Sequence, residues 1–380
     1  VWSYRLTGLG RSQDAQQDMA KASRYAVAPS FSWRPDDKTD FTFLSNFQND
    51  PDAGYYGWLP REGTVVPYYD ANGKAHKLPT DFNEGESDNK ISRRQKMVGY
   101  SFSHQFDDTF TVRQNLRYAE VDTLYRSVYG NGYVAPGYMN RAYVRSDEHL
   151  NTFTVDTQLQ SDFATGAVSH TLLTGVDYYD DDAKRNQNYA NTTPRPTTTV
   201  GTPDNGVGVA DGRAPVQWNT FQARNVGLYF QDTISLTDTL KLVAGLRYDD
   251  FKASYRNPNG SLSSDRSDSL FSPRAGLIFQ PDALSSYYLS YGTSYNTSGD
   301  TYQFSPGLSN STARSANTPA EKSRNIEIGG KFELFERRAL LGVAAFYSEK
   351  YNERNTDPDT AAAQELLSGK RHATGMEFNL

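Results

Sequence analysis

The sequence predicts an all-β protein: a transmembrane, antiparallel, up-and-down β-barrel. Apolar and aromatic side chains recur at every second position in runs of about ten to fifteen residues, which is the period of a strand with two unlike faces. Tight turns and long polar loops join these runs alternately. Aromatic residues make up 13% of the chain, whereas apolar runs such as 340–346 are far shorter than the roughly 20 residues of a transmembrane helix.

The clearest strand pattern lies in FTVRQNLRYAEV at 110–121. Its apolar positions are Phe110, Val112, Leu116 and Tyr118, and the alternate positions are Thr111, Arg113, Asn115 and Arg117. A barrel strand has its apolar side chains toward lipid and its polar ones toward the lumen. We therefore expect Arg113 and Arg117 to face the lumen, where they either contact a plug domain or line water.

The same pattern predicts fourteen strands along the chain. They are expected at 1–12, 22–34, 39–50, 94–107, 109–122, 149–163, 168–179, 222–236, 239–252, 268–280, 285–296, 321–336, 337–351 and 370–380. Short connections are expected at 34–39, 107–109, 165–166, 237–238, 281–282 and 336–337, and long ones at 13–21, 51–93, 123–148, 180–221, 253–267, 297–320 and 352–369. Bacterial outer-membrane barrels have short periplasmic turns and long extracellular loops, so the alternation also predicts sidedness.

Composition argues against several other classes of protein. The net charge is −6 and no basic stripe appears, whereas nucleic-acid binding needs clustered Lys and Arg. The chain contains no cysteine, so it has neither a disulfide framework nor a thiolate metal site. It has only five histidines and lacks the usual zinc-hydrolase, serine-hydrolase and phosphate-loop motifs. We therefore expect neither an enzyme nor a resident metal.

Two of the predicted long loops are rich in tyrosine and tryptophan. Residues 54–70 contain Tyr55, Tyr56, Trp58, Tyr68 and Tyr69, and residues 125–143 contain Tyr125, Tyr129, Tyr133, Tyr138 and Tyr143. Large rigid rings with one polar tip suit the binding of a compact, hydrogen-bonding ligand. Tyrosines in barrel loops also pack loop against loop, and the pattern alone leaves both interpretations open.

Long blocks of the first half resemble TonB-dependent ferric-siderophore receptors of the ferrichrome, or ferric hydroxamate, branch. The blocks are 3–12, 25–65, 78–85, 97–120, 155–166 and 170–178, so the likeness covers residues 1–180 almost without gaps. The resemblance implies a 22-stranded barrel, an N-terminal plug domain and a TonB box before the plug. The fourteen expected strands are then part of such a barrel. Both ends of the chain read as strand interiors, so we expect 1–380 to be a barrel segment, with the plug upstream and the last strands downstream.

The resemblance also implies a location and partners. It predicts the outer membrane of a Gram-negative bacterium, with the lipid bilayer and lipopolysaccharide around the barrel. It predicts uptake of a ferric siderophore driven by the TonB complex, so iron is carried as ferric siderophore and no separate cofactor is needed. Phages or colicins are further partners expected at the extracellular loops.

Four residues are implied as siderophore contacts. The YYGW motif of the family aligns with Tyr56 and Trp58 here. The family's SVYGYG loop reads SVYGNG in this chain, which aligns Tyr129 with the first tyrosine and places Asn131 where the second would be. One aromatic contact is therefore replaced by an amide, and the family's cysteine pair in this loop is missing. Loop 180–221 does not resemble the corresponding loop of the ferrichrome branch.

The second half leaves the choice of siderophore open. Residues 225–380 resemble siderophore receptors in general, and their motifs are closer to those of the ferric-catecholate branch. Either the family is broader than these motifs resolve, or the chain is a mosaic of two receptors with a junction near 180–221. A ferric catecholate is a trianion that needs nearby cations, whereas a ferric hydroxamate is close to neutral. The loop cations are Arg141, Arg145, Arg185, Arg195, Arg213, Arg314 and Lys370.

The sequence favours the hydroxamate, because the aromatic motif is specific and the arginines are scattered among acids. A ferric-catecholate receptor is the alternative within transport. A passive porin and a barrel enzyme are the alternatives from other classes: a porin would have no plug or TonB box, and an enzyme would have a serine–histidine or acid–histidine cluster at one rim.

Overall fold

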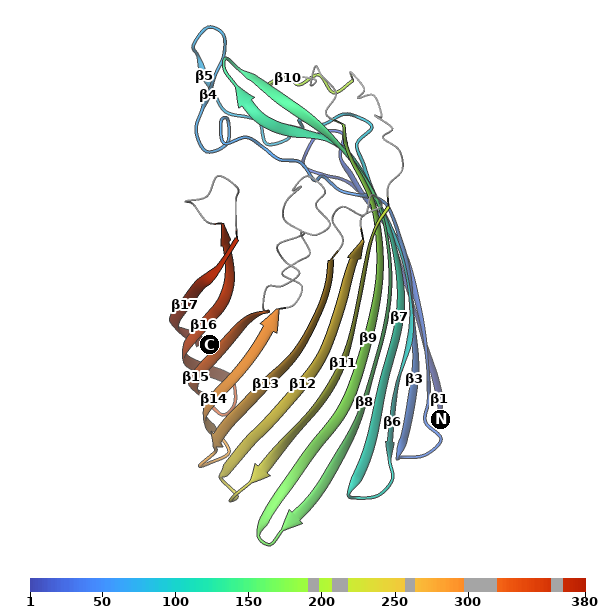
Figure 1. Ribbon diagram of the computed structural model, residues 1–380, viewed down its shortest axis with the longest axis vertical. Coiled ribbons are helices and arrows are strands. Elements are labelled where there is room, and N and C mark those ends of the chain that lie inside the picture. The colour runs from blue at the N-terminus through green and yellow to red at the C-terminus, as the bar shows by residue number, and fades with distance from the viewer. Residues whose placement is uncertain (191–197, 207–217, 257–263, 297–319, 357–364) are drawn as a thin grey trace.

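The computed structural model describes residues 1–190, 198–206, 218–256, 264–296, 320–356 and 365–380. One large antiparallel sheet is curled into a trough, with β1 at one edge and β17 at the other (Figure 1). Each long strand pairs with the next along the chain, which is the up-and-down order predicted from the sequence. Within the described ranges, no helix has the length and apolar character needed to cross a membrane.

All fourteen predicted strands are present, and their lengths extend the prediction at several ends. They are β1 (Trp2–Asp14), β2 (Lys21–Trp33), β3 (Thr39–Ala53), β6 (Lys90–Gln105), β7 (Phe110–Val134), β8 (Tyr138–Thr165), β9 (Val168–Ala190), β11 (Trp218–Ser235), β12 (Leu240–Arg256), β13 (Ser264–Phe279), β14 (Ser285–Asn296), β15 (Glu321–Leu334), β16 (Ala339–Thr356) and β17 (Glu365–Asn379). Within the described ranges, three two-residue strands lie outside this series: β4 (Tyr68–Tyr69), β5 (Ala75–His76) and β10 (Thr198–Thr199).

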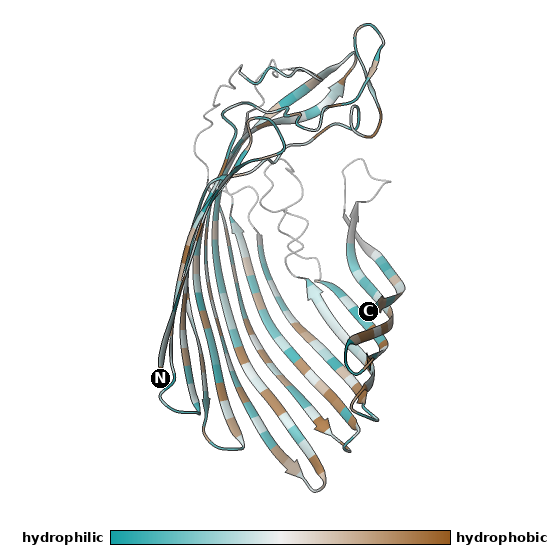
Figure 2. Ribbon diagram, turned by 180° about the vertical axis from the view of Figure 1, so that it is seen from behind, coloured by the Kyte–Doolittle hydropathy of each residue, from teal (hydrophilic) through white to brown (hydrophobic). Residues whose placement is uncertain are grey.

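The strand register gives the sheet one apolar and one polar face. One row of paired residues crosses eight strands on the apolar face: Tyr4, Phe31, Phe43, Tyr100, Leu116, Val155, Tyr178 and Val226. The adjacent row lies on the polar face: Ser3, Ser32, Thr42, Ser101, Asn115, Asp156 and Asp177. Figure 2 shows the resulting alternation of hydrophobic and hydrophilic residues along the strands. Arg113 and Arg117 share the polar face, as predicted.

The six short connections are confirmed, and side-chain hydrogen bonds explain several of them. The Asp107 carboxylate accepts from the backbone N–H groups of Thr109 and Phe110, both at 2.8 Å, and so closes the β6–β7 turn. Asp36 and Asp282 accept from a backbone N–H two residues ahead in the same way. Aspartate favours turns because its carboxylate accepts hydrogen bonds from nearby backbone N–H groups that have no strand partner in the turn.

The long loop predicted at 123–148 is wrong, because this segment continues both neighbouring strands. β7 and β8 run on as one hairpin whose turn lies at 135–137, and the hairpin bends away from the sheet above the other strands (Figure 1). We call residues 123–149 the β7–β8 arm. Its glycines and proline indicated a loop, but alternating aromatic and β-branched residues keep the ladder intact past a shift in register between Gly130 and Tyr133.

Many of the buried residues that the structure describes lie where the arm meets two other segments. We call the β7–β8 arm, residues 54–89 and residues 198–206 together the loop cluster. Its hydrophobic core contains Tyr68, Phe82, Met139 and Val200. β10 adds to the arm by pairing with Tyr138 and Met139. The predicted loop 180–221 is therefore partly strand, since β9 extends to Ala190 and β11 begins at Trp218, and partly a strap across the arm.

Candidate ligand site in the loop cluster

Two exposed aromatic side chains of the loop cluster rest against rings of the β7–β8 arm. The ring of Tyr56 meets the ring of Tyr125 edge-on, with centroids 5.8 Å apart. The indole of Trp58 is tilted against Tyr129 with centroids 6.4 Å apart. Tyr56 and Trp58 remain 62% and 66% exposed, so the contacts with the arm leave most of each surface free. Such ring pairs are geometrically specific and provide flat faces for a ligand.

The Glu84 carboxylate holds the backbone that bears these two rings. Its Oε2 accepts from the Tyr55 hydroxyl at 2.5 Å, and its Oε1 accepts from the backbone N–H of Trp58 at 2.8 Å. Glu84 is completely buried. A Cβ at Gly57 would lie 2.1 Å from both Glu84 Oε1 and the Tyr55 hydroxyl, so only glycine fits between the two anchored residues. Burial, and secondarily the neighbouring Glu84 carboxylate, raises the pKa of Tyr55, so its hydroxyl stays protonated and can donate.

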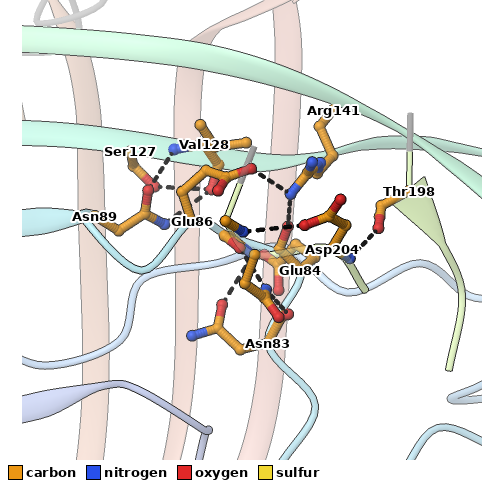
Figure 3. Close-up of polar contacts among 12 residues, drawn as sticks. Asn83, Glu84, Glu86, Asn89, Ser127, Val128, Arg141, Thr198 and Asp204 are labelled. Atoms are coloured by element: carbon orange, nitrogen blue, oxygen red, sulfur yellow. Dashed lines mark hydrogen bonds and ion pairs between the residues drawn. The ribbon is translucent and has the colours of Figure 1, made fainter. Parts of the chain in front are cut away.

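Segment 82–89, whose residues 82–86 are buried, forms a polar floor that contacts the β7–β8 arm (Figure 3). The Asn89 side chain bonds Val128 of the arm twice, donating to its carbonyl at 3.0 Å and accepting from its N–H at 2.8 Å. Arg141, also fully buried, lies 2.9 Å from Glu86 and donates to the Glu84 carbonyl at 3.2 Å. Buried charges need partners of this kind, so the floor fixes segment 82–89 against the arm.

Residues 198–206 also hold segment 82–89 in place, through hydrogen bonds of Asn205. The Asn205 amide donates to the carbonyls of Asn83 at 2.9 Å and Gly85 at 2.5 Å, which flank Glu84 in the sequence. The backbone N–H of Ser87 donates to the Asn205 carbonyl at 2.9 Å. A segment of the loop that does not resemble the ferrichrome branch therefore supports the segment that does.

The structure brings together three of the four predicted siderophore contacts. Trp58 and Tyr129 are neighbours, and Tyr56 is two residues from Trp58 on the same anchored segment. Asn131 is exposed and lies in the register shift after Gly130, so its side chain leaves the regular alternation of the arm. A Cβ at Gly130 would lie 2.8 Å from the Trp58 carbonyl, and glycine here lets the two segments approach closely.

The predicted plug contacts lie away from the loop cluster, on the polar face of the sheet. Arg113 donates to Gln160 Oε1 at 2.9 Å, and Arg117 is exposed. On the same face Arg247 forms ion pairs with Asp177 and Asp249. This face is charged and hydrogen-bonded along its length, which fits a barrel interior.

The described loop cations are already paired with carboxylates. Arg145 lies 3.0 Å from Asp147, Arg185 lies 3.1 Å from Glu148 and Lys370 lies 2.6 Å from Glu349. The fourth, the buried Arg141, is bound to Glu86 as described above. Arg195, Arg213 and Arg314 lie outside the described residues. The cations named from the sequence therefore form no convergent positive cluster in the part of the chain that the structure describes.

Three acid–histidine pairs form among the described residues: His76 with Asp70, His149 with Asp122, and, at the end of the sheet with the tight turns, His170 with Asp232. His170 Nδ1 lies 2.7 Å from Asp232 Oδ2, and His170 Nε2 lies 2.8 Å from Thr165 Oγ1. The imidazole stacks flat on Phe163 and shares the apolar face of the sheet, where a barrel contacts lipid. This position suits an interfacial side chain better than a catalytic base. No group of three or more histidine and acidic side chains suited to a metal occurs among the residues searched, which are those described.

Sequence reasoning missed the residues that hold the site. Glu84, Asn89 and Asn205 carry no periodic signal, and such polar residues in loops are usually solvated. The one usable hint was the run FNEGESDN at 82–89, which places several short polar residues beside a glycine. Only the fold shows that residues 82–86 of this run are buried.

Comparison with known proteins identifies the family. Residues 30–380 match the family model "TonB dependent receptor-like, beta-barrel". The "Ferrichrome outer membrane transporter/phage receptor" of Escherichia coli K12 is 40% identical over 404 aligned residues, covering 100% of this chain and 51% of that protein. The "Ferrioxamine receptor" of Yersinia enterocolitica is 34% identical over 305 residues, covering 76% of this chain and 40% of that protein.

A solved structure gives the same fold at lower identity. The ferric-catecholate import receptor Fiu of Escherichia coli K12 superimposes with a TM-score of 0.85 at 21% identity, over 99% of this chain and 58% of that one. The chain thus spans about half the length of the relatives it matches. These relatives are receptors and transporters, not enzymes. The register, the polar inner face and the family match agree: this chain belongs to the TonB-dependent receptors and forms strands of their β-barrel.

Proposed function

We propose that the protein is a receptor for ferric siderophores in the Gram-negative outer membrane and imports them with energy from the TonB complex. Tyr56, Trp58, Tyr129 and Asn131 would contact the ligand from the extracellular side. The observation that carries this proposal is the exposed pair Tyr56 and Trp58: each ring rests against a ring of the arm, and Glu84 holds the Trp58 backbone N–H. An exposed, rigidly backed aromatic surface is costly without a ligand to cover it.

A hydroxamate of the ferrichrome type is the ligand favoured by charge. Four of the cations named for binding a ferric catecholate are neutralised by Glu86, Asp147, Glu148 and Glu349. A trianion would have to displace these carboxylates, whereas a nearly neutral chelate needs only ring faces and hydrogen bonds. The 40% identity to a ferrichrome transporter supports the same choice. A ferric catecholate is the second candidate, favoured by the structural likeness to Fiu.

Import would require a plug domain inside the barrel. Arg113 and Arg117, with their polar face, are suited to hydrogen bonds and salt bridges with such a domain. Lipopolysaccharide would cover the apolar face beyond the bilayer, and phages or colicins would use the loop cluster as a landing site. A passive porin would need none of the anchored aromatic residues.

Substitution of Tyr56 tests the ligand site. In the complete protein, Tyr56→Ala should weaken ferrichrome binding on the order of tenfold or more, because truncation removes a preorganised ring from the contact surface. Tyr69→Ala is the matched control, since Tyr69 is also an exposed loop tyrosine but lies in the β4–β5 hairpin. Equilibrium titration followed by tryptophan fluorescence gives both affinities.

Each outcome of the titration bears on a separate part of the proposal. Equal affinities in the wild type and Tyr56→Ala would remove this residue from the site. A response to a ferric catecholate without any response to ferrichrome would overturn the choice of ligand. A wild-type protein that binds neither chelate would refute siderophore binding itself.

A further inference from the structure

We propose that Glu84 is the positioning residue of the ligand site: its buried carboxylate sets the geometry of Tyr56 and Trp58 by holding Tyr55 and the Trp58 backbone. The inference rests on the ligand site proposed above and names the residue that organises it. Glu84 does not need to touch the ligand for this role. It acts through the two residues that flank Tyr56 and Gly57 on the same short segment.

The geometry of the carboxylate is specific to this task. Both of its oxygens are used, and each serves a different donor: Oε2 the Tyr55 hydroxyl and Oε1 the Trp58 N–H. The two donors lie three residues apart, so the carboxylate pins both ends of the stretch that carries Tyr56. An ionised carboxylate only accepts hydrogen bonds, and two donors converging on it form stronger bonds than neutral acceptors allow.

Two side chains from other segments hold the backbone around Glu84. Arg141 donates to the Glu84 carbonyl, and the Asn205 amide donates to the carbonyls on either side of it. Gly57 and Gly130 leave the space that the Glu84 side chain and the Trp58 carbonyl occupy. The arm and residues 198–206 therefore hold the backbone of residues 83–85, while both hydrogen bonds of the Glu84 carboxylate go to the aromatic segment.

A solely structural role would predict a different pattern. Asn89 lies on the same buried segment and also makes two hydrogen bonds, but both go to Val128 of the arm and none to residues 55–58. If Glu84 merely stabilised the loop cluster, loss of either side chain would affect Trp58 alike. If Glu84 positions the aromatic pair, only its loss should release Trp58.

The experiment measures Trp58 without any ligand. Tryptophan fluorescence anisotropy is recorded for the complete protein and for each variant, with and without Trp58→Phe. The difference between the two records gives the signal of Trp58, separate from Trp2, Trp33 and Trp218. In Glu84→Gln, one amide N–H₂ faces a donor, so at least one anchor is lost and the Trp58 anisotropy should fall. In Asn89→Ala it should stay at the wild-type value. Limited proteolysis of residues 54–89 reports whether the loop cluster is intact.

The second measurement is ferrichrome affinity. Glu84→Gln should weaken binding by on the order of tenfold to a hundredfold, the effect of losing one hydrogen bond to a charged group. If Glu84→Gln makes the loop cluster protease-sensitive, Tyr55→Phe carries the test, because it removes one donor and leaves the carboxylate in place. Tyr55→Phe should lower the anisotropy and affinity in the same direction, by a smaller factor.

The outcomes are distinct. Unchanged Trp58 anisotropy in both Glu84→Gln and Tyr55→Phe would overturn the inference, as would an equal fall in Asn89→Ala. A wild-type protein that fails to bind ferrichrome would refute the proposed ligand, while the anisotropy measurement would still decide whether Glu84 positions the ring.

Discussion

The hydrophobic core of the loop cluster and the apolar face of the sheet, here called the wall, place large apolar side chains in opposite environments. Met139 in the cluster is fully buried by the protein's own atoms, whereas Leu228 and Ile328 on the apolar face of the wall are 52% and 60% exposed. The cluster also buries charge, in the pair Arg141 and Glu86. The wall therefore needs lipid to remove its apolar surface from water, and the cluster needs only correct internal packing.

This difference teaches that the two regions should fail independently. A change that breaks the buried floor should leave the strand pairs outside the arm intact, and a change on the apolar face should leave the buried floor intact. Substitutions in contact couple energetically, but these regions share few partners. The following predictions test that separation.

The largest expected effect comes from Arg141→Ala. Removing the guanidinium leaves Glu86 buried without its ion pair and should destabilise the loop cluster by about 3–5 kcal/mol. Hydrogen exchange measured by mass spectrometry should show lost protection at 54–89 with unchanged protection in the wall. Arg145→Ala is the matched control, because its ion pair with Asp147 is solvent-accessible and worth about 0–1 kcal/mol. Equal losses in the two variants would contradict the cluster's dependence on buried charge.

The next effect should come from Leu228→Arg on the apolar face. A charge within the apolar band of a barrel costs about 2–4 kcal/mol near the bilayer midplane. Urea unfolding of protein in lipid vesicles should show this loss while the loop cluster stays protected. Gln231→Arg lies on the polar face of the same strand and should cost much less. A larger effect from Gln231→Arg would reverse the assignment of the two faces.

The smallest effect concerns pH and the β4–β5 hairpin at the tip of the cluster. His76, then the backbone N–H groups of Lys74 and Asn72, hold the pKa of Asp70 below its usual 3.8. The ionised form is favoured in the fold, so this stabilisation is present above about pH 4 and is lost as the pH falls through the lowered value. Hydrogen exchange corrected for intrinsic rates should show the hairpin opening below pH 4. Asp70→Asn should abolish that dependence, and a persisting dependence would assign it to another group.

The strands were predictable because their signal is local. Alternation between faces repeats every second residue, and Asp or Thr marks five of the six tight turns, so all fourteen strands and six turns followed from residues close in sequence. The β7–β8 arm was missed because Gly130, Gly132 and Pro136 resemble loop residues. In the structure these residues cause only one shift in strand register and one turn, because the residues around them still pair with the opposite strand.

The candidate site was only half predictable, for a physical reason. Tyr56, Trp58 and Tyr129 were named because their motifs resemble those of the ferrichrome branch, whereas the aromatic pattern alone left ligand contact and loop packing both open. Glu84 and Asn205 are ordinary loop residues until the fold buries them, and the contact between Asn205 and Asn83 joins positions 122 residues apart. A hydrogen bond between residues so far apart in the chain cannot be predicted from the residues next to either of them.

The length of β7 gives the site a mechanical character. Its 25 residues would extend about 80 Å at the usual rise of a strand, several times the roughly 25 Å of a barrel's apolar band. Tyr129 therefore lies near the far end of a strand that continues without a loop from the wall into the arm. A force that a bound chelate or a phage exerts on the Tyr129 ring would be transmitted through the β7–β8 ladder to the barrel. The same force on Trp58 would act on the hydrogen bond between its backbone N–H and Glu84.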